Sequence, residues 1–158
     1  MKKIIGFFIT LSILFGFSST DINATELNNY QNNMYIEEYF DDGSFIEVTL
    51  NSYPIENKSN TRKGTKTKTY KDKNGKLIWS VQVLGTFTYN GKTATCTSSN
   101  IYTTCNASNW KLSNKKSSKS GATAKASVTA KEYTFLGICA KTINSTVTLT
   151  CSPKGVLS

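Results

Sequence analysis

The sequence predicts an all-β fold, an immunoglobulin-like antiparallel β-sandwich. Several runs alternate apolar and polar side chains with period two, as in "IWSVQVLGTFTYNGKTATC" at residues 78–96. Turn signals such as Asn90-Gly91 separate these runs. Thr, Ser, Asn and Lys dominate, and the signals that begin and end helices are scarce. We expect about eight or nine strands, spaced as in a sandwich.

Residues 1–24 have the pattern of a signal peptide. Lys2 and Lys3 form a positive start, the run 4–17 is apolar, and small or polar residues lead to Ala24, the expected cleavage position. An uncleaved membrane anchor is the alternative, but the apolar run is shorter than the ~20 residues that a spanning helix needs. We therefore expect a secreted, extracellular protein whose mature chain has no transmembrane segment.

Residues 25–60 read as an acidic leader, with seven carboxylates against a single cation, Lys58. Two β-rich runs flank Asp41-Asp42-Gly43 and predict a hairpin, one strand of which has an apolar face. A stretch rich in Asn and Ser around Pro54 then predicts a linker. Because of this break in composition, we expect the leader to lie outside the main core.

Residues 61–158 read as a basic β-domain, with sixteen Lys or Arg residues against Asp72 and Glu132. Its first strand is expected near residues 65–70, and a turn at 72–75 leads into the next strand. Gly85 falls in the apolar phase of that strand, which indicates a bend or a close approach of another part of the chain.

Two later segments differ in how clearly they predict structure. The Ala-rich run 122–131 has a helix-like composition, but its apolar residues recur with strict period two, which predicts a strand. Its small inward side chains would leave room for large partners such as Trp79 or Trp110. The Lys/Ser-rich run 115–121 predicts an exposed hairpin tip, and the alternation over 146–151 predicts the last strand.

The four cysteines predict two disulfides, because their number is even and the chain is expected to be exported. A zinc site is the alternative, but the spacings contain no Cys-x-x-Cys pair. Cys96 and Cys151 share the apolar phase of strong strands, so we predict that they pair and that Cys105 pairs with Cys139. Four cysteines allow three pairings, and the sequence alone leaves that choice open.

Three stretches carry a family resemblance: "KTYKDKNGKLIWSV", "GTFTYNGKTATCTS" and "TVTLTCSPKG". They resemble a group of small secreted β-domain proteins of Gram-positive anaerobic bacteria, over about residues 40–158. The resemblance implies export and a β-domain preceded by an acidic hairpin and a Thr/Lys linker, and it implies no particular activity. It also implies that Cys96 and Cys151 belong to the common pattern, whereas Cys105 and Cys139 are additions in this chain.

Catalytic chemistry has few candidates in this sequence. The chain contains no histidine, which excludes Ser/His and Cys/His nucleophile pairs and His-ligated metals. Nothing in the positions of Asp72 and Glu132 indicates a glycosidase pair. Ser-x-x-Lys occurs at Ser108 and Ser113, without the further elements that such sites need. We therefore expect no enzyme activity, no metal and no cofactor.

The lysines are the remaining functional candidates. The first group is expected to align along one hairpin and bind a polyanion: Lys66, Lys68, Lys71, Lys73 and Lys76. A second group lies near Trp110: Lys111, Lys115, Lys116, Lys119 and Lys125. The alternative is that these lysines form solvated strand faces that protect sheet edges. Exposed aromatic residues could stack on sugars, with Tyr70, Tyr102 and Trp110 as candidates, although Trp110 fits the core equally well.

These observations lead us to expect a monomeric, non-enzymatic secreted module that binds an anionic cell-wall or host-surface polymer or glycan. Nucleic acid fits poorly, because the chain is expected to be exported and carries no recognisable reader motif. The alternative is a cationic antibacterial or membrane-acting secreted factor, in which the acidic leader masks the basic domain. A third possibility is a purely structural accessory protein.

Overall fold

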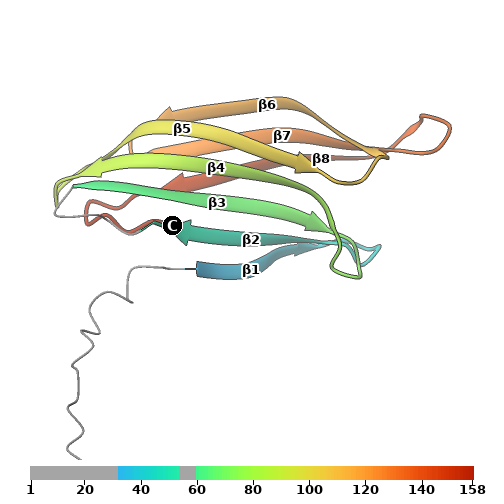
Figure 1. Cartoon of the computed structure of the whole chain (residues 1–158), viewed down its shortest axis with the longest axis horizontal. Coiled ribbons are helices and arrows are strands. Elements are labelled where there is room, and N and C mark those ends of the chain that lie inside the picture. Colours follow the sequence, from blue (N-terminus) through green and yellow to red (C-terminus); the bar gives the residue numbers. More distant parts are fainter. Residues whose placement is uncertain (1–31, 54–59) are drawn as a thin grey trace, which may run out of the picture.

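The structure is a computed structural model that describes residues 32–53 and 60–158. The expected signal peptide and most of the expected linker lie outside these residues. The described chain forms eight strands (Figure 1): β1 (Asn32–Tyr39), β2 (Phe45–Ser52), β3 (Thr61–Lys71), β4 (Leu77–Tyr89), β5 (Ala94–Cys105), β6 (Trp110–Ser120), β7 (Thr123–Tyr133) and β8 (Cys139–Thr150). Within those residues no helix is long and apolar enough to cross a membrane.

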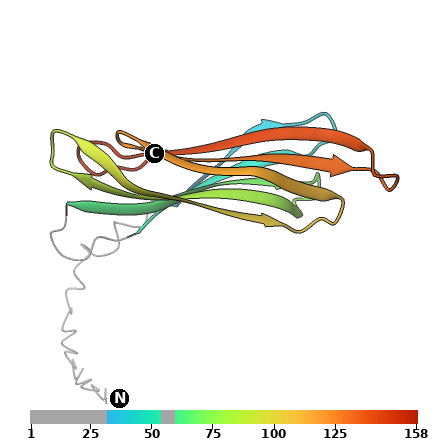
Figure 2. The ribbon, with the colours of Figure 1, turned by 90° about the horizontal axis from the view of Figure 1, so that it is seen from above.

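The strands form two antiparallel sheets, which confirms the predicted all-β sandwich. Sheet A has the order β1-β2-β3-β4-β5, and sheet B has the order β6-β7-β8. Figure 2 shows the two sheets as facing layers. Each strand pairs with its neighbour in the chain, so both sheets are meanders. Immunoglobulin domains share this two-layer arrangement but join their strands by Greek-key connections.

The core lies between the inner faces of the two sheets. Sheet A contributes Trp79 and Phe87 from β4, both fully buried, and sheet B contributes a row of small residues from β7 that includes Ala124 and Ala126. The predicted period-two strand over 122–131 is therefore confirmed, with its small residues facing large ones. Gly85 is also explained, because a Cβ there would lie 2.6 Å from Cε2 of Phe87.

Strand β2 belongs to this core, so the prediction that residues 25–60 lie outside it is wrong for β2. Ile46, Val48 and Leu50 are buried in the core. The strand pairs with β3 from Phe45 opposite Lys71 to Ser52 opposite Gly64. The acidic composition misled the prediction because the described carboxylates lie in the β1–β2 turn or at outward or exposed positions of β1 and β2, whereas the inward positions of β2 are apolar.

The prediction that the Lys/Ser-rich run 115–121 forms a hairpin tip is also wrong. Residues 116–120 pair with β7, and only the β6–β7 turn follows at Gly121. A bulge between Ser113 and Lys116 takes up Asn114, whose φ of 51° is left-handed, a conformation that Asn tolerates. Polar residues can form this strand because β6 lies at the edge of sheet B.

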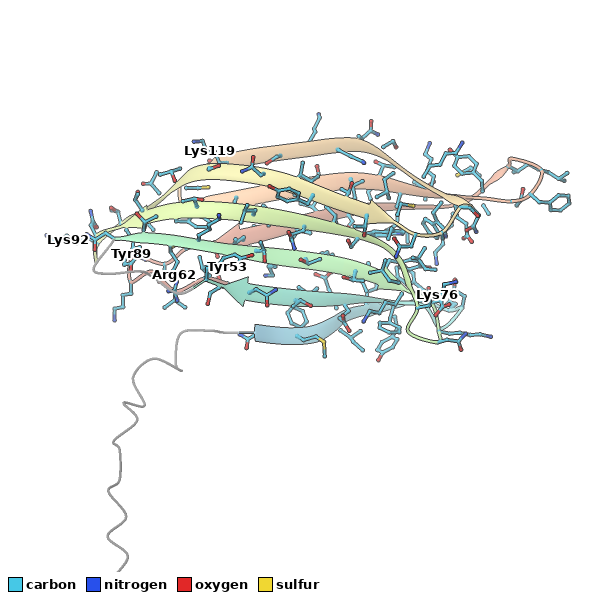
Figure 3. All side chains as sticks on the ribbon, viewed as in Figure 1. Tyr53, Arg62, Lys76, Tyr89, Lys92 and Lys119 are labelled. Atoms are coloured by element: carbon cyan, nitrogen blue, oxygen red, sulfur yellow. The ribbon has the colours of Figure 1, made fainter. Side chains whose placement is uncertain are left out.

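The bulge in β6 turns two side chains toward β5. The Ser117 hydroxyl donates to the carbonyl of Ser99 at 2.7 Å, and the Lys119 amino group donates to the carbonyl of Thr97. Figure 3 shows Lys119 on β6, beside β5. These bonds tie the edges of sheets A and B together along this side of the sandwich.

Candidate functional site

The structure disperses the five lysines that were expected to bind a polyanion together. Lys66 and Lys68 do share a face, as their spacing predicts, but it is the inner face of sheet A, where they lie beside buried Val83 and Val81. They share the phase of buried Tyr70. Sheet B has only three strands against the five of sheet A. We infer that the lysine stems cover apolar surface while their amino groups reach outward past the edge of sheet B.

The other three lysines lie elsewhere, so the expected common exposed face is wrong. Lys71 follows a register shift and pairs with Glu47 at 2.8 Å on the outer face of sheet A. Lys73 and Lys76 are exposed in the β3–β4 turn. Figure 3 shows Lys76 at the opposite end of the sandwich from Lys92. Lys76 is therefore not beside Lys66, whose cross-strand neighbours are Leu50 and Val83.

The acidic segment folds back onto lysines of the basic domain. Three ion pairs join the two among the described residues: Lys68 with Glu37 at 2.5 Å, Lys71 with Glu47 at 2.8 Å, and Lys141 with Asp42 at 3.1 Å. Each carboxylate comes from residues 37–47. Acids of β1, β2 and the turn between them therefore pair with lysines of β3 and β8, whereas the described ion pairs involve no lysine of β6 or β7.

Four lysines without a described ion pair lie on the outer face of sheet B. Its positions follow from the strand register and from the buried alternate residues of β7. All of them are Lys, Ser, Thr or Asn: Lys111, Ser113, Lys116, Ser118 and Ser120 on β6, Thr123, Lys125, Ser127, Thr129 and Lys131 on β7, and Thr142, Asn144, Thr146, Thr148 and Thr150 on β8. We name this set the sheet B outer face.

The charges on the sheet B outer face are of one sign. Lys111 and Lys131 lie directly opposite each other across β6 and β7. Lys116 lies opposite Ser127, two residues from Lys125, so these two lysines are diagonal neighbours, roughly 7–8 Å apart between their Cα atoms. The described ion pairs involve none of these four lysines. The result is a positive surface without internal compensation.

Hydroxyl and amide groups fill the space between the lysines. The Thr129 hydroxyl donates to Oδ1 of Asn144 at 2.9 Å, and the Ser113 hydroxyl donates to the carbonyl of Thr129 at 3.3 Å. A shallow depression of about 360 Å³ crosses the face, lined by residues that include Lys116 and Asn144. Lysine cations beside neutral hydroxyl and amide donors suit phosphate, sulfate or carboxylate groups.

The sequence identified part of this face. It grouped Lys111, Lys116 and Lys125 near Trp110, but it included Lys119, which the bulge turns toward β5, and it omitted Lys131. Asn114 is the signal that could have indicated the bulge. The Thr/Lys alternation over 123–131 is the signal for the β7 part of the face.

A second polar cluster joins the two sheets at the end of the sandwich where the β1–β2 turn lies. Lys141 on β8 donates to the Tyr70 hydroxyl at 2.8 Å and to Oδ2 of Asp42 at 3.1 Å. Tyr70 contacts the Ser44 hydroxyl at 2.6 Å, and that hydroxyl donates to Oδ1 of Asp42. The pKa of Asp42 is lowered to about 2. The largest cause is the hydrogen bond from the Ser44 hydroxyl, followed by the bond from the Ser44 N–H and by Lys141. This closed ring of bonds clamps β8 to sheet A.

The aromatic residues considered for sugar stacking divide between core and surface. Tyr70 and Trp110 are buried and pack with Trp79, with ring centroids 5.3 Å apart for Tyr70 and Trp79, so the prediction that they stack on an external sugar is wrong for both. Tyr102 is exposed.

The two carboxylates of residues 61–158, Asp72 and Glu132, border one depression of about 240 Å³ together with Asp42. Asp72 there accepts the N–H groups of Asn74 and Lys76, which fits the predicted turn.

The four thiols are not bonded to one another in the structure. Cys96 and Cys151 are buried, whereas Cys105 and Cys139 are exposed. Cys105 contacts the carbonyl of Trp110 on β6, and Cys139 contacts the hydroxyl of Thr142 on β8, so β7 lies between these contacts within sheet B. The predicted pairings stay predictions.

Comparisons with protein-family models, curated proteins and solved structures returned no match to this chain.

Proposed function

We propose that this protein is a secreted, non-enzymatic β-sandwich module that binds an anionic cell-wall or host-surface polymer on the sheet B outer face. One observation carries the proposal. The lysines Lys111, Lys116, Lys125 and Lys131 share this face with hydroxyl and amide groups alone, while the three described ion pairs, made by Glu37, Asp42 and Glu47, involve lysines elsewhere. The first lysine group of the sequence analysis is not the binding surface in this proposal.

Protection of a sheet edge accounts for only two of these four lysines. Charged residues often blunt an exposed edge strand, and that reason covers Lys111 and Lys116 on β6. Lys125 and Lys131 are on β7, which is the middle strand of sheet B and has a partner on both sides. A middle strand needs no such protection, so these two cations favour a binding role.

The opposition of Lys111 and Lys131 also favours an anionic ligand. Like charges placed directly across a strand pair destabilise a sheet. A phosphate, sulfate or carboxylate group between the two amino groups would remove that repulsion. Lys111 additionally lies over the ring of Tyr133, with Nζ 5.3 Å from the ring centroid, which holds its stem along the face.

The shape of the face fits a polymer better than a small ligand. The lysines extend from Lys125 to Lys131 along β7, roughly 20 Å at the rise of a strand. Of the four lysines only Lys116 lines the depression, so the charges are spread over the face and are not gathered in one pocket. A chain of repeated anionic groups can contact several of these lysines at once, and each contact releases bound counterions.

Direct binding measurements test this proposal. The protein is titrated with long-chain inorganic polyphosphate, a sulfated glycan and a polyuronate, which carry the three anionic groups that the face suits. A neutral glycan serves as the control ligand. Binding to at least one anionic polymer, and none to the neutral glycan, is the expected result; no binding to any of the three would refute the proposal.

A further inference from the structure

The turn between β7 and β8 exposes three large apolar side chains. Phe135 is 96% exposed, Leu136 69% and Ile138 62%. In Figures 1 and 2 this turn reaches beyond the other loops at its end of the sandwich. Side chains this exposed add little to the stability of the fold, because they remove almost no apolar surface from water. An exposed apolar cluster of this kind marks an interaction site.

The backbone hydrogen-bond pattern of this turn recurs in three other turns of the described chain. Comparing the four turns shows which side chains this backbone requires. Four five-residue turns share one hydrogen-bond pattern: residues 40–44, 72–76, 134–138 and 152–156. In each, the first N–H donates to the fifth carbonyl, and the fourth residue, a glycine, donates to the first carbonyl. The φ values of these glycines lie between 78° and 80°.

The two residues at the tip of this shared turn need not be apolar. The tips of the other three turns are Asp41-Asp42, Lys73-Asn74 and Pro153-Lys154. Only the β7–β8 turn places two large apolar residues there, Phe135 and Leu136. Since the same backbone forms with polar tips, the fold does not account for this pair.

We propose that the β7–β8 tip inserts into the surface of an anionic phospholipid bilayer. The residues behind the tip are ordered as a membrane interface requires. Going back along β7 from the apolar tip, Tyr133 comes first. Lys131 follows two residues further back, directly opposite Lys111 of β6. Lys131 is four residues from Phe135, roughly 13 Å along a strand. Apolar groups of peripheral proteins enter about 5–10 Å into the interface, so these lysines would lie near anionic headgroups.

The backbone of the tip is suited to an apolar environment. The Thr134 N–H donates to the Ile138 carbonyl at 2.9 Å, and the Ile138 N–H donates to the Thr134 hydroxyl at 3.2 Å. Internal bonds of this kind lower the cost of taking a turn out of water. Among the described residues, the carboxylate closest in sequence to the tip is Glu132. It accepts a hydrogen bond from the side-chain amide of Asn109 at 3.1 Å. A protruding tip backed by Lys131 and Lys111 fits a negatively charged bilayer better than a pocket of another protein.

Vesicle sedimentation tests this inference separately from polymer binding. The full protein is spun with vesicles of phosphatidylglycerol and phosphatidylcholine, and with vesicles of phosphatidylcholine alone. We expect binding to the mixed vesicles, and a loss on the order of tenfold or more in the double variant Phe135→Ser, Leu136→Ser. The matched control is Tyr102→Ser, Val156→Ser, which removes two other exposed apolar residues and should bind as the wild type does.

Stability, polymer affinity and oligomeric state show whether the tip contacts a bilayer, the polymer or a second copy of the chain. The tip variant should keep the unfolding midpoint and the polyanion affinity of the wild type. Absence of vesicle binding by the wild type overturns the inference, as does a tip variant that binds vesicles normally. A tip variant that loses polymer binding would place the tip in the polymer site instead. A change confined to the oligomeric state, measured by analytical ultracentrifugation, would identify a second copy as the partner.

Discussion

Cys96 and Cys151 donate their backbone N–H groups to two consecutive carbonyls of the β6–β7 turn. Cys96 bonds to Gly121 at 2.7 Å, and Cys151 bonds to Ala122 at 3.0 Å. Both side chains are buried, which raises the pKa of each thiol, and the neighbouring Cys96 raises that of Cys151 further. The turn thus ties β5 of sheet A to the residue that follows β8 of sheet B, and the two thiols are close enough to interact electrostatically.

We predict that Cys96 and Cys151 form a disulfide in the oxidised protein. Replacing both by Ser should lower the free energy of unfolding by about 2–4 kcal/mol relative to the oxidised wild type, because the bridge restricts the unfolded chain. Non-reducing peptide mapping identifies the pair, and denaturant unfolding measures its contribution. A Cys96–Cys105 link in the peptide map would contradict the prediction. The same map tests the predicted Cys105–Cys139 bridge.

Strand β2 should be essential to the stability of the domain. Ile46→Ala removes a buried side chain between the sheets and should lower the free energy of unfolding by about 2–5 kcal/mol. The control is Met34→Ala on β1, where the side chain is 67% exposed and the expected change is within about 0.5 kcal/mol. Chemical denaturation measures both. Equal, small effects at the two positions would show that β2 is not part of the core.

The Asp42 cluster should make stability depend on pH in the acid range. The bonds from Ser44 and Lys141 hold the pKa of Asp42 at about 2, below its ordinary value of 3.8. A carboxyl with a lower pKa in the folded state stabilises the fold above its unfolded pKa, and this contribution is lost as the pH falls from 3.8 to about 2. Asp42→Asn should therefore lose less free energy of unfolding over that interval than the wild type does.

Denaturant unfolding at several pH values between 2 and 7 measures this effect. The control is Asp41→Asn, which removes the adjacent carboxylate of the same turn and leaves the bonds among Asp42, Ser44 and Lys141 in place. It should retain the acid dependence of the wild type over the interval. An Asp42→Asn variant whose stability falls as steeply as that of the wild type would rule out this cluster as its source.

Local patterns predicted the strands and turns because each of these features depends on residues that are close together in the sequence. Strict alternation defined β7, since a strand with one face in the core must alternate. The Asn90-Gly91 turn needs only a residue that tolerates positive φ, and Gly91 has φ of 86°. The close contact at Gly85 followed from a missing side chain in an apolar phase.

The candidate site was only partly predictable, because it depends on which face each strand turns to the core. Period-two spacing put Lys66 and Lys68 on one face, but only the packing of the two sheets shows that this face is the inner one. One bulge at Asn114 reverses the direction of every later side chain on β6. The acids of the leader likewise masked the apolar residues of β2, since charge composition averages over both faces of a strand.

The salt dependence of polyanion binding distinguishes a site on the sheet B outer face from an effect of net charge alone. Replacing Lys111, Lys116, Lys125 and Lys131 by Gln should weaken binding and reduce the slope of log affinity against log salt by about one for each lysine that contacts the polymer. The control replaces four exposed lysines off the face, Lys73, Lys76, Lys92 and Lys154, and so changes the net charge equally. It should keep most of the affinity and slope. Equal losses in both variants would show that net charge alone drives binding and would contradict a site on the sheet B outer face.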